Sequence, residues 1–286
     1  MHVLVTGGTG TVGSHVVREL AKQNLDVSVL TRDPGKTRLL PPRVKTVGGN
    51  LQSPATVRSV FNNVDVVLLI AAVSQTESHE ALLAVCGMKL ARVKRVVYIS
   101  VLQADKAAWL PHFGAKAGIE EGIRRSGIPY TILRPGHFYQ NDYYSRDALL
   151  QAGIYPQPIG DAGITRIDVR DLAEVAATCL VNSGHEGRTF ELGAPDPQTG
   201  SSTAAAWSRA LGREIKYGGN DLEAWEQQSL KHMPDFIVFD YKLMFEYLQT
   251  GAMTISKEAV MEQTRLLDHP ARTFEAFAKE TAAVWT

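Results

Sequence analysis

Short runs of β-branched and other apolar residues recur along the first half of the chain, separated by stretches with helical spacing. The runs cover 2–6, 26–30, 44–47, 64–71, 95–100 and 130–134. This alternation is typical of strand–helix–strand units. Residues 66–72 are apolar without alternation, as expected of a central parallel strand covered by helices on both faces. The pattern therefore predicts an α/β protein with a doubly wound parallel sheet.

The pattern changes in the second half of the chain. The segment 151–163, "QAGIYPQPIGDAG", is rich in Gly and Pro and predicts a loop. Beyond it, helical spacing with scattered aromatic residues predicts a smaller, mostly helical lobe. We therefore expect a main domain over 1–150 and a C-terminal lobe over 151–286. A short strand, a helix from about Val169 and a further strand predict that parts of 164–193 rejoin the main sheet.

Composition narrows the class of partner. Among 286 residues, 30 Lys and Arg balance 30 Asp and Glu, so no net charge draws the protein to nucleic acid or to an anionic membrane. The longest apolar run is too short to span a bilayer. The two cysteines, Cys86 and Cys179, lack metal-type spacing and indicate a reducing compartment. We expect a cytoplasmic protein that binds neither nucleic acid nor membrane directly.

Metal chemistry is not indicated by the sequence. The eight histidines show no ligand spacing, and no zinc-type cluster accompanies them. Asp168 and Asp171 could serve catalysis or a metal, but they stand at the start of the helix predicted over 170–181. Capping that helix is the favoured role. No metal is predicted.

A glycine-rich turn stands between the first strand and the first helix. In "VLVTGGTGTVGSHVV", Gly7, Gly10 and Gly13 have the spacing G-x-x-G-x-x-G. Gly7 permits a tight turn, Gly10 lets the backbone approach a pyrophosphate, and Gly13 lets the helix pack closely on the strand. The helix N-terminus then offers N–H groups to the phosphates. The turn predicts a dinucleotide-binding site.

The end of the second strand distinguishes two cofactors. A carboxylate there would bind the ribose 2′-hydroxyl of NAD, whereas an arginine suits the 2′-phosphate of NADP. The sequence reads "LTRDPGK", with Arg32 after the strand and Lys36 nearby. Asp33 follows Arg32 directly, and its carboxylate would weaken the preference for NADP over NAD. Its other role is to turn the chain before Pro34, which is a common role of Asp. We favour NADPH.

Several longer blocks resemble the NmrA-like family of atypical short-chain dehydrogenase/reductases. They are "TGGTGTVGSHVV", "TRDPGK", "GNLQSPATVRSVFNNVDVV", "PHFGAKAGIEEGIRRSGIPYTILRPGHFYQN" and "RTFEAFAKETAAVW". The resemblance covers most of the chain and implies a Rossmann core, NADP(H) binding and a substrate site that involves the smaller lobe. It also implies roles for individual positions. Those expected around the cofactor are Gly7, Thr9, Gly10, Thr11, Val12, Gly13, Arg32, Asn50, Leu51, Ala71, Ala72, Val73 and Lys116.

The catalytic position departs from the family pattern. Ketoreductases of this kind use Tyr-x-x-x-Lys, whereas here His112 stands four residues before Lys116. An imidazole can act as a general acid near neutral pH. His112 could equally form the N-terminal cap of a helix that starts near Phe113. Both roles stay open, while Lys116 is expected to reach the nicotinamide ribose.

The missing tyrosine bears on the acceptor. A simple ketone needs an acid in the transition state, whereas quinones and conjugated dyes spread the charge and need little acid help. The segment "RPGHFYQNDYY" supplies His137, Phe138, Tyr139 and Tyr143 as a platform for a flat substrate, although such aromatics also pack lobes. We predict an NADPH-dependent oxidoreductase acting on a quinone-like or conjugated acceptor. The alternative is a non-enzymatic NADP(H)-binding regulator or redox sensor. A homodimer is a further candidate arrangement.

Overall fold

The computed structural model describes residues 1–285, apart from the side chains of Pro34, Thr37 and Leu39. The chain forms two compact units. The first contains 1–134 and 169–191, and the second contains 135–168 and 192–286. The sequence placed the boundary at residue 150; the structure assigns 135–150 to the second unit. The physical reason is pairing, because the strand at 137–138 bonds to the strand at 166–167. Residues 169–191 belong to the first unit.

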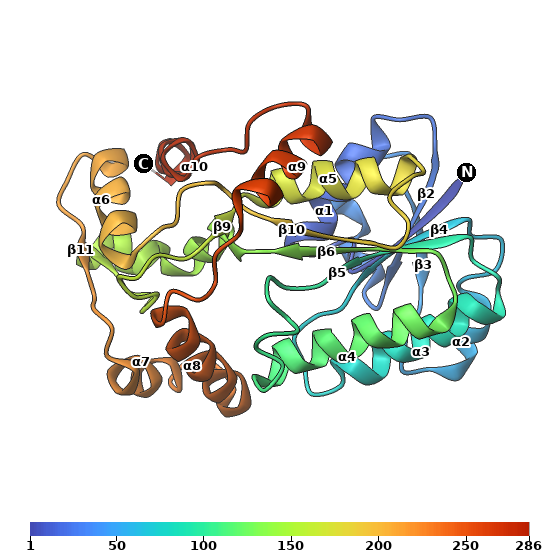
Figure 1. The fold of residues 1–286 in the computed structure, drawn as a ribbon, viewed down its shortest axis with the longest axis horizontal. Coiled ribbons are helices and arrows are strands. Elements are labelled where there is room, and N and C mark those ends of the chain that lie inside the picture. Colours follow the sequence, from blue (N-terminus) through green and yellow to red (C-terminus); the bar gives the residue numbers. More distant parts are fainter. Residues whose placement is uncertain (286) are drawn as a thin grey trace. The chain divides into compact units, whose positions relative to one another are not determined.

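The first unit is built on a seven-stranded sheet (Figure 1). Its order is β10-β6-β5-β4-β1-β2-β3, and the pairings from β6 through to β3 are parallel. The order reverses direction between β1 and β4, which is the switch point at which such sheets bind ligands. The strands are β1 (His2–Thr6), β2 (Asp26–Thr31), β3 (Lys45–Gly48), β4 (Val66–Ile70), β5 (Arg95–Ile99), β6 (Tyr130–Pro135) and β10 (Arg188–Leu192).

Helices cover both faces of this sheet, as the sequence predicted. Figure 1 shows α1 (Thr11–Ala21) and α5 (Val169–Val181) on one face and α2 (Pro54–Ser59), α3 (Glu77–Leu90) and α4 (Pro111–Ser126) on the other. Alternate residues of the strands serve the two faces. Val67 and Leu69 of β4, with Val96 of β5, join a core with Ile119 and Ile123 of α4.

The second unit is mostly helical, as expected. Its helices are α6 (Gly200–Leu211), α7 (Leu222–Ser229), α8 (Asp235–Gln249), α9 (Lys257–Leu267) and α10 (Phe274–Trp285). Two short strand pairs accompany them, β7 (His137–Phe138) with β9 (Arg166–Ile167) and β8 (Ile154–Tyr155) with β11 (Lys216–Tyr217). Two short helical segments, η2 (Tyr139–Ser145) and η3 (Ala148–Ala152), follow β7. Large side chains such as Trp207, Phe274 and Phe277 are buried between the helices.

Candidate functional site

The glycine turn has the geometry that a dinucleotide requires. Gly7 has φ +63°, a conformation that side chains disfavour. The N–H of Gly10 donates to the carbonyl of Gly7 at 3.0 Å. A Cβ on Gly13 would lie 2.3 Å from the Gly7 carbonyl oxygen, so any side chain there would push α1 away from the turn. Gly10 caps α1 without a side chain, which leaves the first-turn N–H groups available to an anion.

A neighbouring glycine was missed by the sequence reasoning. A Cβ on Gly8 would lie 2.7 Å from both methyl groups of Val29 on β2. The turn therefore presses against the second strand as well as against its own helix. The "GG" pair was the sequence signal for this position. The physical reason for a glycine there is a contact between segments that are distant in the sequence.

One cavity of about 530 Å³ lies beside this turn. Four chain segments contribute to its wall, following β1, β2, β3 and β4 respectively, as expected at the carboxyl edge of a parallel sheet. The predicted cofactor residues in its lining are Gly7, Thr9, Arg32, Lys36, Asn50, Leu51, Ala71, Ala72 and Val73. Thr11, Val12 and Gly13 form the adjoining first turn of α1. The structure thus brings together residues that are spread over the first 73 positions.

The cationic end of the cavity contains Arg32 and Lys36, both exposed. Asp33 has the turning role that the sequence favoured. Its Oδ1 accepts a hydrogen bond from the N–H of Gly35 at 2.8 Å, and its own N–H donates to Thr31 Oγ1 at 3.1 Å. Asp33 shapes the segment on which the two cations stand, so its carboxylate is already engaged by the backbone.

The sequence analysis also did not predict a group of hydrogen-bonded side chains on the cavity wall. Gln52 Nε2 donates to Glu80 Oε1 at 2.7 Å, and Thr76 Oγ1 donates to the same oxygen at 2.6 Å. Burial raises the pKa of Glu80, but the hydrogen bonds from Thr76 and Gln52 and the charge of Arg32 outweigh it and hold the pKa below its usual value. Glu80 is therefore an anion that faces the same cavity as Arg32.

The helix that carries the catalytic pair starts earlier than expected. α4 begins at Pro111, a favourable first helical residue, and Leu110 occupies the capping position. His112 therefore does not cap the helix, which corrects that alternative. Its ring is 8% exposed and lies edge-on to Phe113, with centroids 4.7 Å apart. The acid role of His112 stays a prediction.

Lys116 forms a buried ion pair that the sequence did not indicate. Its Nζ lies 2.6 Å from Glu77 Oε1, and the two side chains are 11% and 1% exposed. Glu77 is the first residue of α3 and lines the cofactor cavity. The partners are 39 residues apart in the chain, so no local motif connects them. The only sequence signal was a carboxylate in the first turn of the helix after β4.

The predicted substrate residues of the second unit have differing exposure. His137 is buried, Phe138 is half-buried, Tyr139 is fully buried and Tyr143 is 48% exposed. The Tyr139 ring packs against Phe274 and Phe277, with centroids 5.1 and 5.5 Å away. Its hydroxyl donates to the carbonyl of Arg272 at 3.3 Å. The structure favours the packing role for Tyr139, because its ring is enclosed by α10.

A buried ion pair organises this part of the second unit. Arg166 Nη2 lies 2.6 Å from Asp142 Oδ1, and both side chains are 0% exposed. The other Asp142 oxygen accepts from Trp207 Nε1 at 2.9 Å. The guanidinium carbon lies 4.7 Å from the Phe274 ring centre. Burial and the charge of Arg166 hold the pKa of His137 well below its usual value, so this imidazole is neutral.

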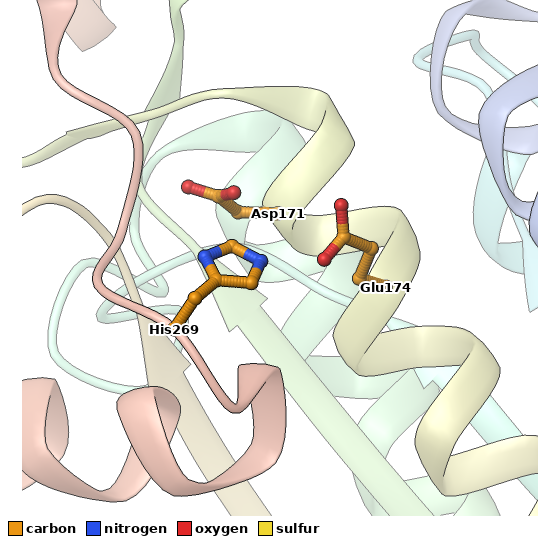
Figure 2. A group of neighbouring side chains, drawn as sticks. All are labelled: Asp171, Glu174 and His269. Atoms are coloured by element: carbon orange, nitrogen blue, oxygen red, sulfur yellow. The ribbon is translucent and has the colours of Figure 1, made fainter.

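The carboxylates near the start of α5 carry no metal assignment. Figure 2 shows Asp171 and Glu174 projecting from α5. Asp168 is buried and accepts a hydrogen bond from Gln140 Nε2 at 2.9 Å. In the second unit, the ring of His269 bonds to the carbonyl of Pro270 at 2.7 Å. The absence of a metal stays a prediction.

Residues 7–183, more than half of the chain, match the model of a family described as NAD(P)H-binding. The chain therefore belongs to the NAD(P)H-binding family, and the prediction of an NAD(P)H-binding Rossmann domain is confirmed. The seven-stranded sheet and the glycine turn are the structural counterpart of this match.

The chain is similar over nearly its whole length to several known proteins. The NAD(P)H azoreductase of Xenophilus azovorans is 30% identical over 99% of both chains. Quinone oxidoreductase 2 of Escherichia coli is 28% identical over 95% of both, and a solved structure of an Escherichia coli NADPH-dependent quinone oxidoreductase with NADPH superposes with a TM-score of 0.88, at 23% identity over 98% of this chain and 99% of that one. NmrA, a negative transcriptional regulator, superposes with a TM-score of 0.78, at 16% identity over 99% and 96%.

Among residues 1–285, no helix combines the length and the apolar composition needed to cross a bilayer.

Proposed function

We propose that the protein is an NADPH-dependent oxidoreductase that transfers hydride to a quinone-like or otherwise conjugated acceptor. The observation that carries the proposal is the cavity beside the glycine turn, with Arg32 and Lys36 at one end and Glu77, the partner of Lys116, also in its wall. The fit is physical, because Gly13 lacks the Cβ that would meet the Gly7 carbonyl oxygen, so the N-terminus of α1 stays close to the turn that a pyrophosphate approaches. When bound, NADPH supplies the hydride.

The residues of this chain bind and orient the cofactor. The N–H groups at the start of α1 meet the pyrophosphate, and Arg32 meets the 2′-phosphate, which its planar guanidinium matches better than a carboxylate could. Asp33 turns the chain between the two cations, with its Oδ1 accepting from the N–H of Gly35. Lys116 donates to the nicotinamide ribose. These assignments favour NADPH over NADH.

The proposed class of acceptor follows from the absence of the usual tyrosine at position 112. With His112 at that position, buried beside Phe113, strong acid assistance is not required of the protein if the acceptor delocalises its charge. Quinones and azo dyes are such acceptors, and relatives of this chain are described as an azoreductase and a quinone oxidoreductase. Tyr143, half-exposed, and Phe138 are the aromatic residues proposed to meet a flat substrate.

The test is a titration followed by a turnover assay. NADPH and NADH are titrated directly, and NADPH consumption is then followed by absorbance with a panel of quinones, azo dyes, enones and simple ketones. We expect tighter binding of NADPH, turnover with quinones or dyes, and none with simple ketones. Turnover of ketones alone would contradict the proposed acceptor class.

A regulator is the second candidate, and the fold that the chain shares with NmrA favours it. It predicts NADP(H) binding without turnover of any acceptor in the same panel. A cytoplasmic location and a homodimer accompany the main proposal. Fractionation and sedimentation measurements test them.

A further inference from the structure

The Lys116–Glu77 pair lies in the interior, where an ion pair is costly. Both side chains are almost fully removed from water, and the loss of hydration offsets much of the attraction between such charges. Stability alone is therefore a weak reason for the pair. The location of the pair gives a better reason for it, because Glu77 lies in the wall of the cavity beside the glycine turn.

The negative charge of Glu77 also acts on Tyr98 of β5. The hydroxyl of Tyr98 on β5 is buried and has no hydrogen-bond partner among the described residues. Burial and the negative charges of Glu77 and Glu120 raise its pKa well above the usual value, so Tyr98 stays neutral. Lys116 is the cation that pairs with Glu77 in this interior. The ammonium has three N–H donors, of which one goes to Glu77 and two can serve a ligand.

We propose that Glu77 is the positioning residue for Lys116. The carboxylate fixes the ammonium of a long, flexible side chain at one place beside the cofactor cavity. The remaining N–H donors then meet the nicotinamide half of NADPH without a further loss of side-chain freedom. This inference rests on the proposed function, since it concerns the same site.

The test separates the two halves of the cofactor. NADPH is titrated by its fluorescence, and adenosine 2′,5′-bisphosphate, which lacks the nicotinamide riboside, is titrated by calorimetry. Glu77→Gln is expected to raise the Kd of NADPH on the order of tenfold and to leave the Kd of the bisphosphate within about twofold. Lys116→Met should do the same. The double variant should be no weaker than Lys116→Met alone, because Glu77 acts only through the lysine.

A graded variant and a matched control complete the design. Glu77→Asp keeps the charge on a shorter side chain and should give an intermediate increase in the Kd of NADPH, which decides the matter if Glu77→Gln does not fold. Glu121→Gln removes the partner of Arg125 in an exposed ion pair on the same helix and should change neither Kd.

Three results would overturn the positioning role. The first is an unchanged Kd of NADPH in Glu77→Gln, or in Glu77→Asp if Glu77→Gln does not fold. The second is an equal rise in the Kd of NADPH and of the bisphosphate. The third is a rise in the double variant that equals the product of the two single rises. Failure of the proposed function looks different, because the wild-type protein would then bind neither ligand, or would bind both and turn over no acceptor of the panel. Circular dichroism of each variant identifies those that fold.

Discussion

The cofactor cavity of the first unit is assembled from segments that each follow a strand, whereas the 137–143 segment of the second unit is arranged around a buried ion pair. In the first unit, Gly7 and Arg32 face an open cavity. In the second, Tyr139 and Arg166 are fully buried. The topology of a parallel sheet brings ligand-binding residues together at one edge, and each segment that contributes them can be recognised from its local sequence. A buried network depends on partners from distant segments, which no single segment reveals. Substitutions in the cavity of the first unit should therefore change cofactor affinity most, whereas substitutions in the buried network of the second unit should change the free energy of unfolding most.

The largest expected effect lies in the buried network. Asp142→Asn removes the charge that balances Arg166, and breaking such a pair from one side costs about 3–5 kcal/mol. Urea unfolding should show this loss. Glu275→Gln, which breaks the exposed pair with Arg209, serves as the control and should cost less than about 1 kcal/mol. A loss equal to that of the control would mean that the ion pair does not organise this unit.

Gly13→Ala tests the close approach in the first unit. The added Cβ would meet the Gly7 carbonyl oxygen at 2.3 Å, and relief of that overlap should cost about 1–3 kcal/mol of stability together with most of the NADPH affinity. The matched control is Gly118→Ala, a helical glycine with nothing within 4 Å of its added Cβ. It should be neutral or stabilising by about 0.5–1 kcal/mol. Normal NADPH binding by Gly13→Ala would remove the turn from the site.

Arg32→Ala should affect binding without affecting stability. Charged hydrogen bonds contribute about 1.5–3 kcal/mol, so the Kd of NADPH should rise on the order of tenfold to a hundredfold, while that of NADH stays constant. Arg38→Ala, an exposed arginine of η1 (Pro34–Leu39), is the control. If the preference for NADPH survives in Arg32→Ala, the phosphate assignment is wrong.

The smallest effect concerns pH. The pKa of His137 is held well below 6.5 in the folded protein, so as pH falls below about 6.5 the unfolded chain takes up a proton that the folded protein does not. Stability should therefore fall with pH by at most about 1.4 kcal/mol per unit from this group. In His137→Gln, urea unfolding between pH 6.5 and 5 should be less dependent on pH. An unchanged slope would show that the histidine does not contribute.

Much of the first unit could be predicted from the sequence because its signals are local. The strand runs, the glycine spacing and Arg32 after β2 each act within a few residues. Glu77 could not be predicted as the partner of Lys116, because the two meet only after α3 and α4 pack together. Tyr139 and Tyr143 have similar sequence contexts, yet one is enclosed and the other is half-exposed. Both rings contact Phe277 of α10, so the difference depends on how much of each ring the folded unit covers.

The path of the chain has a consequence for dissection of the protein. The chain passes from one unit to the other near residues 134, 168 and 191. A fragment ending at 134 would lack α5, which covers the same face as α1, and would also lack the edge strand β10. No single truncation therefore yields an intact cofactor-binding fragment. Isolating the first unit would require deletion of 135–168, a linker between 134 and 169, and truncation after 191.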